Sequence, residues 1–94
     1  MSPVARTIVD QINSLDPRAL FAWGARQFVY SPNSLQFNST GMCKWKGVVQ
    51  IVLNGNDLYD IRFMRIRQLK VVEDVTVTDI YAENLIRVLD AKIG

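Results

Sequence analysis

The segment Lys46–Val77 constrains the fold more strongly than any other part of this 94-residue chain. Two runs of alternating apolar residues flank the turn sequence Asn54–Asn56, and a third apolar run follows them. Because side chains of a strand alternate between the two faces of a sheet, these runs predict a β-hairpin and a further antiparallel strand. We expect the three strands near residues 46–53, 58–67 and 71–77.

The length of the loop between the first two strands decides which side chains share a face. A two-residue turn would place Val49 opposite Asp60 and bury a carboxylate in the core. A three-residue loop pairs Val49 with an isoleucine, and a five-residue loop pairs it with Phe63, so both keep the face apolar. We therefore predict an odd loop, of three or five residues, with Gly55 or Asn56 at positive φ.

A helix is predicted at the start of the chain. Ser2-Pro3 suits a helix start, apolar residues recur at helical spacing over residues 4–15, and Asp16-Pro17 ends the pattern. The next segment, residues 20–30, is rich in aromatic residues. We predict one bent strand or two short strands there, with Gly24 marking a bulge or a close packing contact.

A second helix is predicted at the end of the chain. Apolar residues recur at helical spacing over residues 82–93, and Thr78 or Asp79 is expected to cap this helix. Glu83 and Arg87 are four residues apart, in the order that favours an ion pair on a helix surface.

The element order predicts the fold class. A turn at 31–34 and a short strand at 35–37 complete a series of helix, four or five short strands, and helix. Successive strands joined by short loops are antiparallel, so we predict a single α+β domain, residues 1–94, with both helices on one face of an antiparallel meander sheet. The helical stripes are expected to share their core with Leu20, Phe28, Phe37, Val49, Ile51, Ile61, Phe63 and Leu85.

Composition argues against several kinds of chemistry. The chain has no histidine, which removes the commonest general base and metal ligand. Its single cysteine, Cys43, has no imidazole partner, so we interpret it as a small apolar residue near a loop. Metal-ligand and phosphate-loop spacings are absent. We predict a non-enzyme without cofactor or metal, located in a reducing cytoplasm.

Charge is unevenly distributed along the chain. Residues 44–72 carry six basic and two acidic side chains, whereas residues 73–94 have a net charge of −3. Strand alternation places Arg62 on a different face from Arg65 and Arg67 unless a bulge intervenes, which weakens the case for a single basic stripe. The sequence leaves open whether the indole of Trp45 is exposed. The candidate contacts with a protein partner or a nucleic acid are Trp45, Lys46, Arg62, Arg65, Arg67 and Lys70.

Three segments resemble a group of small proteins encoded by tailed phages and prophages. They are GARQFVYSPNSLQF (24–37), VVQIVLNGNDLYDIRF (48–63) and DIYAENLIRVL (79–89), within a resemblance that covers about three-quarters of the chain. The chain departs from the group at Ala22-Trp23, where a methionine-threonine pair is typical, and at its DAKIG end. The resemblance implies a phage-associated intracellular protein and brings no biochemical activity with it.

These observations together predict a small, non-enzymatic phage or prophage accessory protein in the host-cell cytoplasm. We expect it to act by binding a host or phage protein, such as a defence or regulatory factor. The alternative is a nucleic-acid-binding protein that uses the basic sheet segment. No membrane contact is expected, because the apolar runs are too short to cross a bilayer. A homodimer is compatible with the small size of the chain.

Overall fold

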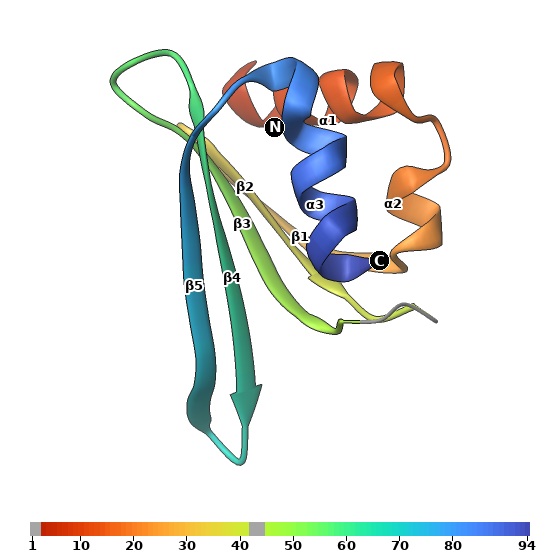
Figure 1. Cartoon of the computed structure of the whole chain (residues 1–94), viewed down its shortest axis with the longest axis vertical. Helices are drawn as coiled ribbons and strands as arrows, with labels where there is room; N and C mark the ends of the chain where they lie inside the picture. The colour runs from red at the N-terminus through yellow and green to blue at the C-terminus, as the bar shows by residue number, and fades with distance from the viewer. Residues whose placement is uncertain (1–2, 42–44) are drawn as a thin grey trace.

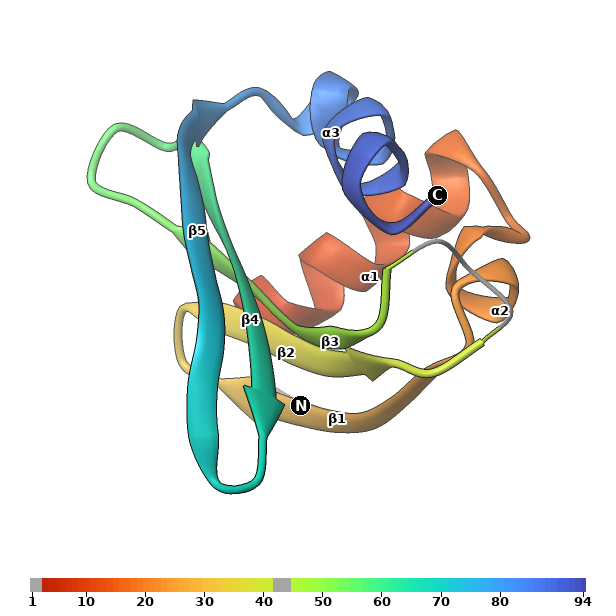
Figure 2. The same cartoon turned by 60° about the horizontal axis from the view of Figure 1, so that its bottom comes forward.

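The computed structural model describes residues 3–41 and 45–94, so the predictions for Ser2 and Cys43 lie outside the described residues. All five strands form one antiparallel sheet in the order β1-β2-β3-β4-β5, and α1 and α3 lie on the same face of it (Figures 1 and 2). The predicted α+β meander is therefore confirmed. Its elements are α1 (Pro3–Leu15), α2 (Ala19–Ala22), β1 (Ala25–Ser31), β2 (Ser34–Ser39), β3 (Gly47–Leu53), β4 (Tyr59–Arg67), β5 (Lys70–Ile80), the 3₁₀ turn η1 (Ala82–Asn84) and α3 (Leu85–Ile93).

Helix α1 ends where the sequence predicts. Ile8 and Ile12 are fully buried, whereas Leu15, which the apolar stripe placed in the core, is 46% exposed. Leu15 is the last residue of α1, and its side chain borders a surface hollow that Ala82 also lines. The Asp16 carboxylate then accepts a hydrogen bond from the next turn, which begins the short helix α2.

The prediction of strand structure throughout residues 20–30 is wrong in its first part. Residues up to Ala22 belong to α2, and β1 starts only at Ala25. Trp23 and Gly24 lie between them. Gly24 has a φ of 62°, and the backbone N–H of Gly41 donates to the carbonyl of Trp23 at 3.1 Å. Gly24 therefore marks a close approach of two backbone segments. The irregularity of β1 lies further along, between Arg26 and Val29.

The β3–β4 loop has the five-residue length that was one of the two predicted alternatives. Its residue at positive φ is Asp57, at 58°, so the assignment to Gly55 or Asn56 is wrong. The side chain of Asn54 explains the difference, because its Oδ1 accepts a hydrogen bond from the N–H of Asn56 at 2.8 Å. This local hydrogen bond fixes the backbone conformation of residues 54–56, so the left-handed conformation falls on Asp57, later in the loop.

Two rows of apolar side chains, here called the two core rows, cross the inner face of the sheet from β2 to β5. Each row consists of residues directly opposite one another on neighbouring strands. On β2, β3 and β4 their members are at most 1% exposed. The first row is Leu35, Ile51, Ile61 and Val77, and the second is Phe37, Val49, Phe63 and Val75.

The helices cover the two core rows incompletely. Side chains of α1 and α3 bury the β2, β3 and β4 members, yet Val75 and Val77 on β5 remain 41% and 38% exposed. Of the predicted core residues, Leu20 and Phe28 are only half-buried at its margin. The fully buried helix residues are Ala5, Ile8, Ile12, Leu85, Leu89 and Ile93.

The predicted cap of the last helix is wrong. Strand β5 continues past Thr78 and Asp79 to Ile80, which is buried opposite Tyr59. Asp79 adopts a φ of 57°, and its backbone N–H donates to the Asp60 carboxylate at 3.0 Å. Burial of Ile80 against the core thus keeps the strand extended where capping preferences alone suggested a helix start.

Replacing Gly24 by alanine tests the close approach. A Cβ atom at Gly24 would lie 2.3 Å from the backbone nitrogen of Gly41, in a left-handed conformation. We expect Gly24→Ala to lower the free energy of unfolding by about 2 kcal/mol or more. Gly55→Ala is the matched control, because no atom lies within 4 Å of the added Cβ; it should change stability by less than about 0.5 kcal/mol. Urea denaturation measures both, and equal effects would contradict this packing.

Candidate functional site

Strand β5 forms one edge of the sheet and is exposed over most of its length. It pairs with β4 without interruption from Glu73 to Val77, and the irregularities lie outside this stretch. The segment Val75–Thr78 consists of β-branched residues, all of them exposed. Edge strands are usually protected by charged side chains, proline or a bulge, and the stretch from Val75 to Val77 has none of these. It is therefore an open edge with a regular backbone.

The opposite edge, β1, is less regular. Its pairing with β2 is interrupted between Arg26 and Val29, and Gln27 has a φ of 57°. Such a bulge twists the strand and disrupts the spacing that a further strand would need. Of the two edges, β5 is the one suited to pairing with another strand.

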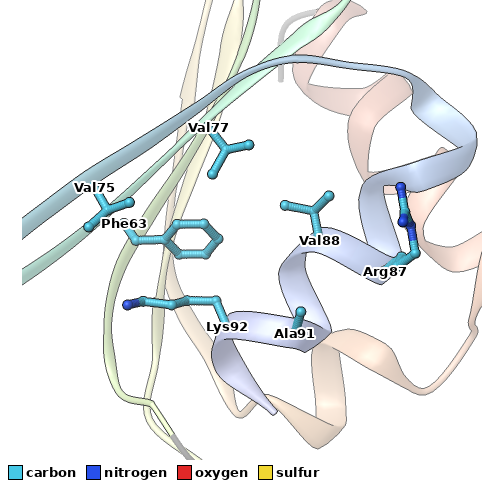
Figure 3. A pocket seen from close by; sticks show the side chains of 7 residues that line it. All are labelled: Phe63, Val75, Val77, Arg87, Val88, Ala91 and Lys92. Atoms are coloured by element: carbon cyan, nitrogen blue, oxygen red, sulfur yellow. The ribbon is translucent and has the colours of Figure 1, made fainter.

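A groove of ≈ 400 Å³ lies between β5 and α3 (Figure 3). On the strand side the groove is lined by Phe63 and by Val75 and Val77, the last two of which form the exposed end of the two core rows. On the helix side it is lined by the face of α3 that carries Val88 and Ala91. The groove is mainly apolar, with one arginine and one lysine from α3 among its lining residues. Those lining residues are Phe63, Val75, Val77, Arg87, Val88, Ala91 and Lys92.

Glu73 on β5 joins three elements near this groove. Its carboxylate accepts hydrogen bonds from Lys92 Nζ at 2.5 Å and from Trp45 Nε1 at 2.9 Å, and Arg65 Nη1 lies 3.8 Å away. The hydrogen bond from Lys92, followed by that from Trp45, holds the pKa of Glu73 below its usual value. The ammonium of Lys92 also lies 5.6 Å from the centre of the Trp45 ring. Lys92 is thus already engaged.

Trp45 is buried, with 7% of its surface exposed. Its ring meets that of Phe63 edge to face, with 5.6 Å between ring centres. Trp45 therefore supports the floor of the groove and Glu73 from within, and it does not present its ring as an exposed contact surface. Trp23 is also buried.

The strand arginines are divided between the two faces of the sheet, as alternation predicts. Arg62 forms a two-pronged ion pair with Asp74, with Nη2–Oδ2 at 2.6 Å and Nε–Oδ1 at 2.9 Å. This contact raises the pKa of Arg62 and lowers that of Asp74. Arg65 is opposite Glu73, on the side of the sheet that carries the groove. Two of the four basic strand residues considered for nucleic-acid binding thus have carboxylate partners within the protein, although Arg65 shares Glu73 with Lys92.

The two remaining basic strand residues lie at the tip of the β4–β5 hairpin, which extends beyond the other strands (Figure 1). Arg67 and Lys70 are directly opposite each other, and neither forms an ion pair within the described part of the chain. Between them, Gln68 and Leu69 have φ values of 53° and 65°, and Leu69 is 99% exposed. Lys46 lines a separate hollow beside Ile66. The structure therefore does not assemble the six predicted contact residues into one surface.

Sequence reasoning missed most of the groove. Val75 and Val77 were expected in a strand, but their exposure depends on which strands the helices cover. The last strand of a meander necessarily forms an edge of the sheet. This rule could have indicated from the sequence that the strand carrying Val75 and Val77 is open on one side. The pair Glu83–Arg87 was also expected on one helix, whereas Glu83 lies in η1 before α3 begins, and these two residues form no ion pair.

Comparison with protein-family models, with curated proteins and with solved structures finds no match to this chain. Within residues 3–41 and 45–94, no three histidine, cysteine or carboxylate side chains gather in a way that could hold a metal ion. In the same residues, no helix has both the length and the apolar character needed to span a membrane.

The pH dependence of stability tests the Glu73 contacts. A lowered folded-state pKa means that ionised Glu73 stabilises the fold above its ordinary pKa, about 4.3. This contribution is lost as the pH falls through the lower, folded-state value. We expect Glu73→Gln and Lys92→Met to lose less stability than the wild type between neutral pH and pH of about 3. Urea midpoints at the two pH values measure this. Identical pH dependence in all three proteins would contradict the assignment.

Proposed function

We propose that this protein is a non-enzymatic binding module that takes up an extended segment of another protein along β5. The observation that carries the proposal is the exposed end of the two core rows. A sixth strand paired with β5 would face alternate side chains toward the inner face, next to Val75 and Val77, and would continue both rows. Strand addition of this kind is a general mode of peptide recognition.

The groove supports this mode because it lies where the inward side chains of an added strand would fall. The side chains of Val75 and Val77 form its strand side, and Val88 and Ala91 form its helix side (Figure 3). Main-chain hydrogen bonds to β5 would contribute about 1 kcal/mol each. Apolar side chains in the groove would add about 25 cal/mol per Å² of buried apolar surface. The first term gives affinity for any extended segment, and the second gives preference for particular sequences.

The contacts of the strand arginines and the burial of Trp45 favour a protein partner over a nucleic acid. Arg62 and Arg65 already have carboxylate partners, and Trp45 is buried away from any base that could stack on it. The nucleic-acid alternative is left with Lys46, Arg67 and Lys70. The resemblance to phage and prophage proteins leads us to propose a host or phage protein in the cytoplasm as the source of the segment.

Selection from a library of random linear peptides tests the proposed function. Peptides enriched on the immobilised protein should carry two apolar residues at positions i and i+2, because these would face Val75 and Val77. Ala91→Arg fills the groove from the exposed side of α3. We expect it to weaken binding of the selected peptides by about tenfold or more, measured by fluorescence anisotropy.

Ala22→Arg provides the matched control. Ala22 is an exposed alanine on α2, and it does not line the groove, so this variant should bind the peptides as the wild type does. Circular dichroism establishes that both variants fold. The proposal is contradicted if no peptide is enriched, or if Ala91→Arg binds the enriched peptides as tightly as Ala22→Arg does.

A further inference from the structure

Arg87 differs from Lys92, the other charged residue that lines the groove, because it has no ion-pair partner among the described residues. It lies on α3, is exposed, and lines the groove beyond Val88 (Figure 3). Within residues 3–41 and 45–94 it forms no ion pair. The other cation of the groove, Lys92, is held by Glu73 at 2.5 Å. The groove therefore presents apolar walls and one uncompensated positive charge.

The local fold explains why Arg87 lacks a carboxylate partner. Glu83, four residues earlier, would face Arg87 if both residues lay on one regular helix. Instead Glu83 belongs to η1 and borders the hollow beside Leu15, with α3 beginning only at Leu85. Glu73, the carboxylate on the β5 side, is engaged by Lys92 and Trp45. Among the residues that the structure describes, no acidic side chain lines the groove to neutralise the guanidinium.

We propose that the segment bound along β5 carries a carboxylate that pairs with Arg87, in addition to two inward apolar residues. This inference rests on the proposed function and specifies its ligand. A guanidinium presents a planar fork of donors that matches a carboxylate. The carboxylate can come from an aspartate or glutamate side chain or from the C-terminus of the segment, because both offer the same two oxygens.

The expected effect is one of selectivity more than of affinity. Arg87 lies at the exposed rim of the groove, where a charge pair is screened by solvent. Replacing the carboxylate of a selected peptide by its amide should therefore weaken binding by about two- to fivefold. The apolar positions and the strand pairing should account for most of the remaining affinity.

A charge reversal at Arg87 tests the inference. Peptide selection is run on the wild type, on Arg87→Glu, and on Arg18→Glu as a control with the same charge change at an exposed site outside the groove. We expect an acidic residue or a free C-terminus at one fixed position in peptides selected by the wild type and by Arg18→Glu. Peptides selected by Arg87→Glu should carry lysine or arginine there, or lose the preference.

Synthetic peptides with free and amidated C-termini then distinguish the two sources of the carboxylate. Loss of binding on amidation assigns the contact to the C-terminus. Loss on glutamate-to-glutamine or aspartate-to-asparagine replacement assigns it to a side chain. Either result supports the inference. Enriched peptides with no charge preference, unchanged by Arg87→Glu, overturn it while leaving the proposed function intact. Failure to enrich any peptide overturns both.

Discussion

The two core rows are the constraint on which the rest of the structure depends. Register places large apolar residues opposite one another on β2, β3 and β4, and α1 and α3 cover these positions completely. The same pairing continues onto β5, where the helices no longer cover Val75 and Val77. An incompletely covered edge therefore follows directly from the way the core is built. The proposed function uses the part of the core that two helices leave open.

The groove remains open because of how α3 is held against β5. Near its end α3 reaches the strand through a long side chain, Lys92, which bonds to Glu73. Beside it, Ala91 faces the groove with a single methyl group. A larger residue at Ala91 would fill part of this space. Small side chains on α3 thus leave the space beside Val75 and Val77 unfilled.

Much of the fold could be predicted because it depends on local alternation. The odd β3–β4 loop followed from the need to keep Asp60 away from the buried face. Other features depend on partners distant in sequence. The short helix α2 precedes Gly24, whose conformation is set by its approach to Gly41. The groove joins Val75 and Val77 to residues ten or more positions later on α3, and its openness depends on side-chain size at Ala91. No sequence pattern reports such a relation.

Amide hydrogen exchange along β5, with and without a selected peptide, is the most direct measurement of strand addition. In the free protein, amides of Glu73–Val77 that point toward β4 should be protected, and the alternate amides, which point away from β4, should exchange rapidly. The rapidly exchanging amides should become protected when the peptide binds. Unchanged exchange of these amides in a saturated complex, with protection appearing elsewhere, would contradict strand addition at this edge.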